Sequence, residues 1–180
     1  MSVAIRPARP EDAAQLVELG SAVGAEDGAW LLTTDGWRSV ADERRYLRAL
    51  KRYPHAAVFV AEAAEGIIGR LSIARDPHPA SHHVADLGLM VAAGRRRQGV
   101  GTALMAEATA WARGAGVRKL ELHVFPHNDA AIALYEKLGF RREGYRTNHY
   151  RRGDGYVDAI LMALDLDEMQ ESESGASRPL

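Results

Sequence analysis

The spacing of apolar residues along this chain predicts alternating strands and helices. Runs rich in β-branched and aromatic residues, with apolar residues at every second position, indicate strands, and apolar residues repeated every three or four positions indicate helices. The predicted strands are residues 3–7, 56–63, 67–74, 84–91, 119–125, 141–150 and 156–164; the predicted helices are one that begins at residue 10 and ends before a loop at 24–36, and those at 35–52, 101–113 and 129–138.

Turn and cap residues support these boundaries. Residues 64–66, Ala-Glu-Gly, separate two β-rich runs as the short turn of an antiparallel hairpin would. Asn128 or Asp129 is placed to cap the following helix, and Gly139 supplies the left-handed residue that ends it. Strict alternation at 119–125 predicts one face made of Leu120, Leu122 and Val124 and another made of Glu121, His123 and Phe125.

Length and composition bound the architecture. The 180 residues are 47% hydrophobic, which suits one well-filled core. We expect a single domain over residues 1–166. Residues 167–180 are polar and rich in Ser and Glu, so they cannot bury enough surface to offset their ordering entropy, and we expect a disordered tail there.

Charge and residue usage exclude several classes of function. Lys and Arg number 23 against 24 Asp and Glu, so the net charge of -1 provides no overall field that would draw the chain to nucleic acid or to an anionic membrane. No apolar run reaches the about 20 residues of a membrane span and no signal peptide is recognisable, so we expect a cytoplasmic protein. The absence of cysteine excludes disulfides, thiolate metal sites and thioester enzyme intermediates.

A local anion site is predicted where the strand at 84–91 runs through a basic loop into the helix at 101–113. Residues 99–102 present free backbone N–H groups and the positive end of a helix dipole. Glycines let the chain approach an anion closely, and the arginines at 95–97 supply charge beside it. The alternative is a plain connecting loop with solvated arginines. The glycine spacings of NTPase phosphate loops and of dinucleotide-binding motifs are absent.

Two motifs in this order resemble the GNAT family of acetyltransferases. Arg96-Arg97-Gln98-Gly99-Val100-Gly101 is similar to the family's pyrophosphate signature Arg/Gln-x-x-Gly-x-Gly/Ala, and residues 128–140 are similar to its segment after the fifth strand. The order of elements from Val3 to Leu164 is also that of the family, although Ala93 stands where many members have proline. The resemblance implies an α/β fold with a mixed sheet of about seven strands flanked by about four helices, and acetyl-CoA as cosubstrate.

Carried over position by position, the resemblance implies where acetyl-CoA is held. Its pyrophosphate is expected on residues 96–101, within the segment 95–101 that we call the arginine–glycine loop. Its pantetheine and sulfur are expected to face Asn128 and Tyr135. If the strand bulges near Leu89, its N–H groups would polarise the thioester carbonyl. The implied contact residues are Leu89, Met90, Val91, Arg96, Arg97, Gln98, Gly99, Val100, Gly101, Thr102, Asn128, Ala131, Leu134, Tyr135 and Lys137.

The resemblance further implies an N-acetyltransferase in which the acceptor amine attacks acetyl-CoA directly. A lysine-like amine has a pKa near 10.4, so generating its free base at pH 7 costs about 4 to 5 kcal/mol and calls for a base or a desolvated pocket. Asp86 stands where many members have a glutamate base, and Tyr135 stands where the departing thiolate is protonated. Asp86 is one methylene shorter, which favours a water relay; His83 and His123 are alternative bases. Asp86 and Tyr135 also have structural alternatives, as a backbone-bonding acid and a core aromatic.

The sequence defines the acceptor less closely. Segments 81–86, 121–125 and 151–158 resemble family members that acetylate amino acids or small amines, and less closely those that acetylate ribosomal-protein N-termini. The acceptor is expected to contact residues 27–37 and 146–156, which mix Trp and Tyr with Asp. Alternatives are a protein N-terminal or lysine acetyltransferase and a non-catalytic coenzyme A-binding module. We expect no nucleic-acid partner and, because known zinc-ligand spacings are missing, no metal; the resemblance also allows a homodimer.

Overall fold

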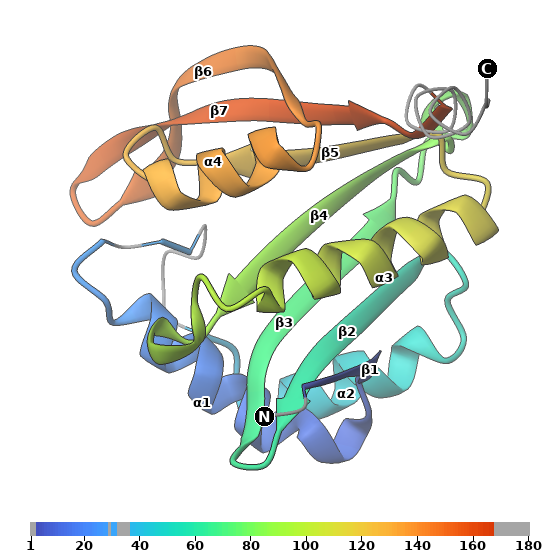
Figure 1. Ribbon diagram of the computed structural model, residues 1–180, viewed down its shortest axis with the longest axis vertical. Helices are drawn as coiled ribbons and strands as arrows, with labels where there is room; N and C mark the ends of the chain where they lie inside the picture. Colours follow the sequence, from blue (N-terminus) through green and yellow to red (C-terminus); the bar gives the residue numbers. More distant parts are fainter. Residues whose placement is uncertain (1–2, 29, 32–36, 168–180) are drawn as a thin grey trace, which may run out of the picture.

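The computed structural model describes residues 3–28, 30–31 and 37–167 (Figure 1). Its centre is a seven-stranded sheet with the strand order β1-β2-β3-β4-β5-β7-β6. Neighbouring strands are antiparallel except for β4 and β5, so the predicted mixed sheet is confirmed. The strands are β1 (Ala4–Pro7), β2 (Ala56–Ala63), β3 (Gly66–Arg75), β4 (Val84–Val91), β5 (Lys119–Val124), β6 (Arg141–Arg152) and β7 (Gly155–Asp165).

Four helices cover the two faces of the sheet. On one face, Leu104 of α3 packs in the main apolar cluster with Leu71 of β3. On the other face, Leu16 of α1 packs in a second cluster with Val60 of β2. The helices are α1 (Ala13–Gly24) and α2 (Val40–Leu50) on this second face, and α3 (Val100–Gly114) and α4 (Asp129–Lys137) on the first (Figure 1). None of the described helices is long and apolar enough to cross a bilayer.

The alternation predicted for β5 is confirmed. Leu120, Leu122 and Val124 are at most 4% exposed and lie in the main cluster with α3. The intervening residues point to the face of α1 and α2, because side chains alternate along a strand. His123 of β5 and Asp86 of β4 therefore share that second face.

Helix starts differ from the sequence prediction. The helix expected from residue 35 begins at Val40, because the Ser39 hydroxyl accepts the Asp42 N–H at 3.2 Å and caps it there. Residues 35–36 lie outside the described chain, as does the expected tail from residue 168 onward. The first helix opens with a 3-10 turn over Pro10–Asp12 and becomes α-helical at Ala13.

β4 and β5 pair over three residues and then separate. Their register runs from Val84↔Lys119 to Asp86↔Glu121. Beyond it, β4 continues with β2 and β3 under α3, whereas β5 continues with β6 and β7 beside α4 (Figure 1). The β3–β4 ladder is regular along all of this stretch, so the strand has no bulge near Leu89. Within the described chain, it is the early end of the β4–β5 pairing that leaves one side of β4 without a strand partner.

Candidate functional site

The arginine–glycine loop enters α3 through two left-handed residues. Arg97 has a φ of 58° and Gly99 a φ of 83°. The left-handed conformation costs a non-glycine residue about 1 to 2 kcal/mol, and strain of this kind gathers at binding sites. The strained arginine therefore favours a binding loop over a plain connection.

The N-terminus of α3 has no side-chain cap. Gly99 is its N-cap residue, whereas the side chains of Ser39 and Asn128 cap α2 and α4. In the described part of the chain, the N–H groups of residues 100–102 have no hydrogen-bond acceptor. Together with the helix dipole, these N–H groups form a set of donors for an anion, as the sequence predicts.

Gly101 brings three of the predicted binding residues together. A β-carbon at this position would lie 3.0 Å from Cδ2 of Leu134 in α4 and 3.5 Å from Cδ2 of Leu89 in β4. The first distance is shorter than the usual separation of two packed carbon atoms. Glycine thus lets the start of α3 approach α4 and β4 closely, and the loop meets two other predicted binding residues at this point.

The guanidinium of Arg96 is bound within the protein. Its two Nη atoms donate to the carboxylate of Glu26 at 2.7 and 2.6 Å, and its Nε donates to the Val91 carbonyl at 3.0 Å. Glu26 follows α1 and also accepts a hydrogen bond from Trp30 Nε1 at 2.8 Å. The hydrogen bonds from Arg96 hold the pKa of Glu26 below its usual range. Arg96 therefore ties the loop to the end of α1, a contact that the sequence did not reveal.

The other two arginines of the loop differ from Arg96. Arg95 forms an ion pair with Glu65. Arg97 is exposed and has no acidic partner among the residues described. The side chain of Gln98 donates to the Gly94 carbonyl at 3.0 Å and closes the loop on itself. Arg97 is thus the loop arginine with a side chain available to an anion.

Replacing Glu26 with glutamine is expected to lower the free energy of unfolding by about 1 kcal/mol, because a bidentate charge-assisted pair is lost from a partly solvated site. Urea unfolding of Glu26→Gln, Arg96→Gln and the double variant measures this. We expect the double variant to be less destabilised than the sum of the two single variants, and Arg97→Gln to have no effect on stability. Strict additivity would contradict the tie between the loop and α1.

Asn128 and Tyr135 lie on α4. Asn128 caps the helix, as predicted, because its Oδ1 accepts the Ala131 N–H at 3.2 Å. Tyr135 is 6% exposed and packs against Phe140, with ring centroids 5.7 Å apart. Burial raises the pKa of its phenol. Buried tyrosine hydroxyls usually have a hydrogen-bond partner, yet no described residue provides one here, so the hydroxyl is available to a ligand.

The remaining predicted binding residues divide between core and surface. Val100 lies in the main cluster, and Met90 packs against Leu19 and Val23 of α1 on the other face. Any contact that Val100 or Met90 makes with a ligand would therefore come from the backbone. Leu89, Val91 and Ala131 are partly buried beside the main cluster, and Thr102 and Lys137 are exposed.

Asp86 lies where β4 and β5 separate, directly opposite Glu121. Solvent reaches its side chain, but the surrounding protein raises the pKa of Asp86 to about 6; Glu121 adds to this rise and Arg146 opposes it. Such a carboxylate is ionised at pH 7 and takes up a proton more readily than an ordinary aspartate, as a general base requires. His83, an alternative base, precedes β4 and makes no described hydrogen bond with Asp86.

A second titratable pair stands on the same face. The Tyr150 hydroxyl and Nδ1 of His123 form a hydrogen bond of 2.5 Å. Burial lowers the pKa of His123 and raises the pKa of Tyr150, and the charge of Asp86 raises the latter further. His149 packs edge-on against both rings, with centroids 5.5 and 4.7 Å away. The lowered pKa favours the neutral imidazole of His123. His149 is a member of the site that no sequence motif identified.

An irregularity in β6 brings these rings to β5. Between the pairs made by Arg146 and Tyr150, β6 has three residues where β7 has one. Asn148 adopts a φ of 51° there. The Asp158 carboxylate accepts the Asn148 N–H at 2.7 Å and the Tyr145 hydroxyl at 2.6 Å, which fixes the shape of the irregular segment. Bulges re-aim side chains in this way beside active sites.

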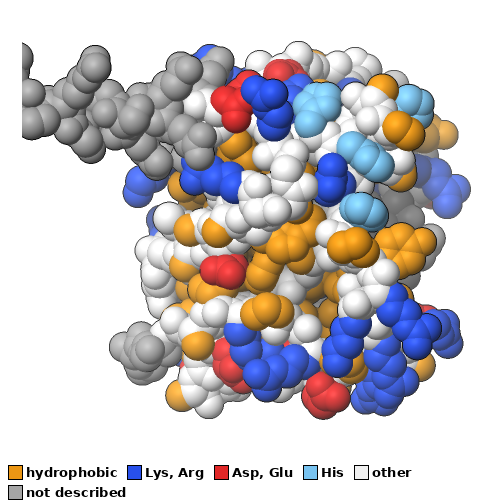
Figure 2. Space-filling model, turned by 90° about the vertical axis from the view of Figure 1, so that its right-hand side faces the viewer, with side chains coloured by type: hydrophobic (Ala, Val, Ile, Leu, Met, Phe, Trp, Pro, Cys, Tyr) orange, Lys and Arg blue, Asp and Glu red, His pale blue; other side chains and the backbone are white. Residues whose placement is uncertain are grey.

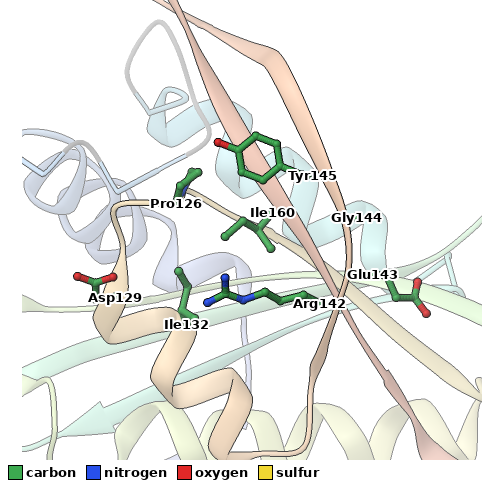
Figure 3. Close-up of a pocket in the computed structure, with 8 residues that line it drawn as sticks. All are labelled: Pro126, Asp129, Ile132, Arg142, Glu143, Gly144, Tyr145 and Ile160. Carbon is green, nitrogen blue, oxygen red and sulfur yellow. The ribbon is translucent and has the colours of Figure 1, made fainter.

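A pocket of about 590 Å³ lies on the opposite face of the sheet, between α4 and the β6–β7 hairpin (Figure 3). Ile132 and Arg142 approach one another in it, whereas Glu143 points away. Ile160, which also lines it, belongs to the main cluster on the side of α3 and α4. None of the predicted catalytic or binding residues lines this pocket, so the candidate site remains at the separation of β4 and β5.

A second charged surface lies apart from this site. α2 carries the exposed residues Arg44 and Arg48, and the exposed Arg52 follows in the turn after it. Lys and Arg side chains gather low on one side of the molecule, with histidines above them (Figure 2). Within the described ranges, no three His, Asp or Glu side chains converge as metal ligands. The positive charge of these arginines does not by itself indicate a ligand.

Comparison with known proteins identifies a family and several relatives. The model of the Acetyltransferase (GNAT) family matches residues 27–140. The chain is 39% identical over 101 residues to the L-amino acid N-acetyltransferase AaaT of Escherichia coli K12, which covers 54% of this chain and 60% of the relative. It is 46% identical over 71 residues to the ribosomal protein bS18-alanine N-acetyltransferase of the same organism, over 39% of this chain and 48% of the relative. The chain thus matches about half to three fifths of these relatives' lengths.

Solved structures share the fold over most of the chain. An acetyltransferase of the GNAT family from Streptococcus pneumoniae superimposes with a TM-score of 0.81 and 28% identity, over 91% of this chain and 99% of the other. YncA of Salmonella typhimurium, solved with its cofactor acetyl-CoA, gives a TM-score of 0.81 with 21% identity, over 93% and 95%. The second likeness is one of fold alone.

Proposed function

Because the chain belongs to the GNAT family of acetyltransferases, we propose that it transfers the acetyl group of acetyl-CoA to the primary amine of an amino acid or another small amine. The amine would attack the thioester directly in a ternary complex, since the chain has neither a cysteine nor a Gly-x-Ser-x-Gly elbow to carry the acetyl group. The likeness to the amino acid acetyltransferase AaaT supports this acceptor class.

The arginine–glycine loop and the start of α3 suit the pyrophosphate of acetyl-CoA. The free N–H groups at 100–102, the strained backbone of Arg97 and the close approach at Gly101 are features that a diphosphate requires. Arg97 would contribute its charge, and Arg96 would act indirectly, by holding the loop on Glu26. Acetyl-CoA itself supplies an activated carbonyl group for attack.

Asp86 is the proposed general base. It would take the proton from the acceptor ammonium, directly or through one water molecule, and leave the nitrogen lone pair free to attack. The raised pKa of Asp86 at the β4–β5 separation is the observation that carries the proposal. At this separation, a thioester held on the face of α3 and α4 meets an amine held on the face of α1 and α2.

Tyr135 is the proposed proton donor to the departing thiolate. A change of Tyr135 to phenylalanine removes the hydroxyl alone and is expected to lower kcat about 10-fold while the KM for acetyl-CoA stays within about two-fold. The effect is smaller than that of a strong general acid, because the raised phenol pKa makes Tyr135 a hydrogen-bond donor more than a proton source. Steady-state kinetics measure both constants, and an unchanged kcat would remove Tyr135 from the mechanism.

Release of coenzyme A thiol tests the proposed activity. The chain has no cysteine, so a chromogenic thiol reagent reports coenzyme A alone. We expect thiol release with free amino acids or small amines and none with their N-acetylated forms, which lack an attacking nitrogen. Acetyl-CoA binding without thiol release across amines and peptides would instead favour the alternative of a coenzyme A-binding module.

A protein N-terminus is the second candidate acceptor. The likeness to the bS18-alanine N-acetyltransferase favours it, over 71 residues. Peptides that begin with alanine, compared with free alanine in the thiol assay, separate the two acceptor classes. A kcat/KM that is higher for the peptides would replace the small-amine proposal.

A further inference from the structure

Opposite charges share the sheet face that holds Asp86. Asp86 and Glu121 stand opposite one another on β4 and β5. Arg146 of β6 pairs with Ala159 of β7, the neighbour of Ile160, whose side chain lies in the main cluster on the other face. Because side chains alternate along strands, Arg146 points to the face of Asp86. Its charge is close enough to act on the Asp86 carboxyl.

Arg146 nevertheless has no acidic partner in the described part of the chain. Its guanidinium contacts His149 Nε2 at 3.2 Å. The neighbouring acids are engaged elsewhere, since Lys119 pairs with Glu121 at 2.8 Å and with Glu143 at 2.7 Å. A guanidinium is the side chain best shaped to bind a carboxylate through two parallel hydrogen bonds. An anion from outside the protein therefore has a place beside Arg146.

The position of Arg146 is held by the surrounding structure. It begins the irregular segment of β6, which Asp158 fixes through Asn148 and Tyr145. A binding group that is fixed before the ligand arrives loses less freedom on binding. The backbone that carries Arg146 is thus fixed before a ligand arrives, and its exposed side chain is free to reach that ligand.

We propose that Arg146 binds the α-carboxylate of the acceptor while Asp86 receives its ammonium group, which makes the acceptor a free α-amino acid. This inference rests on the proposed N-acetyltransferase function and narrows its substrate class. A simple amine has no carboxylate, and in a peptide the α-carboxyl group of the first residue is part of an amide bond. Neither can therefore form this contact with Arg146. The juxtaposition, on one face, of an acid and an arginine that lacks an acidic partner among the described residues matches the two charges of a zwitterion.

The test compares amino acids with their carboxamides. Phenylalanine, methionine and alanine are each assayed as the free acid and as the amide in the wild-type protein, Arg146→Gln and Arg151→Gln. Arg151 is the matched control, because its pairing with Tyr156 places it on the other face of the same strand. We expect Arg146→Gln to lower kcat/KM for the acids by about 10- to 100-fold, the size of a charged hydrogen-bond loss. The amides should be nearly unchanged when all assays are run well above the pKa of Asp86, because Arg146 also holds that pKa down.

The ratio of acid to amide within each variant decides the outcome. The ratio should fall in Arg146→Gln and remain at the wild-type value in Arg151→Gln. Equal losses for acid and amide, or no loss, would overturn the carboxylate contact and leave the acetyltransferase function standing. If no amine releases thiol, the proposed function fails, and calorimetric titration with the amino acids still tests the contact: binding that Arg146→Gln weakens supports it, and binding that is absent or unchanged refutes it.

Discussion

Replacement of Asp86 with asparagine is expected to lower kcat/KM for the acceptor amine by about 100- to 10,000-fold, the usual contribution of a general base. Asparagine keeps the size of the side chain but cannot take a proton. In the wild type, kcat/KM should fall below pH 6 as the carboxylate is protonated, and this acidic limb should vanish from the residual activity of the variant. Calorimetric titration with acetyl-CoA should give an unchanged Kd.

Glu121→Gln is the control for this prediction. Glu121 raises the pKa of Asp86, so its removal should move the acidic limb to lower pH and leave the plateau largely intact.

The pH dependence of stability provides a second check on the raised pKa of Asp86. A carboxyl with a raised pKa in the folded state stabilises the protein below its unfolded pKa of about 3.8, and that contribution is lost as the pH rises through about 6. Asp86→Asn should therefore have a higher Tm than the wild type at pH 7.5 and a similar Tm at pH 4. If Asp86→Asn kept the wild-type dependence of kcat/KM on pH, Asp86 would not be the general base.

The change Gly101→Val is expected to weaken acetyl-CoA binding by roughly 100-fold or more, because several charge-assisted contacts would be lost together. The added side chain would enter the space between Leu134 and Leu89, where its β-carbon alone would lie 3.0 and 3.5 Å from their Cδ2 atoms. Isothermal titration with acetyl-CoA measures the loss. Gly101→Ala should lose less affinity for acetyl-CoA, since its methyl group requires Leu134 to move by only a few tenths of an ångström.

Gly114→Val is the matched control. Gly114 is the last residue of the same helix, and no atom lies within 4 Å of a β-carbon built there. Both variants carry the helix cost of valine, so the difference in Kd isolates the site. Equal Kd values for the two variants and the wild type would show that acetyl-CoA does not approach α3 at Gly101.

The spacing of apolar residues predicted the structure best in elements that bury one face. In β5, Leu120, Leu122 and Val124 enter the core while the residues between them do not, and the period of two is plain in the sequence. β6 has no such signal, because it is an edge strand of mostly exposed residues. Its irregularity depends on Asn148 and Asp158, which are 10 positions apart and lie on different strands of the hairpin. The residues near Asn148 and Asp158 form no sequence pattern that predicts this contact.

In the candidate site too, the sequence predicted residues within motifs but not contacts between distant parts of the chain. The sequence pointed to Gly101, Asp86 and Tyr135, because each lies in a motif or at a fixed offset from one. It could not show that Arg96 reaches Glu26, since these residues are 70 positions apart and meet through the docking of α1 on the sheet. Nor could it show the pairing of Asp86 with Glu121, because apolar spacing fixes which residues share a face but is unchanged when the register shifts by two residues.

The edge position of β6 has a consequence for how this chain diversifies. Arg146 and His149 are exposed on a strand that has one neighbour, β7, so replacing them disturbs little of the core. Gly101 and Arg96 lie against packed elements and tolerate less change. Among descendants of a common ancestor, we therefore expect the residues proposed to contact the acceptor to change faster than the residues proposed to hold acetyl-CoA, so that new acceptors arise without a new fold.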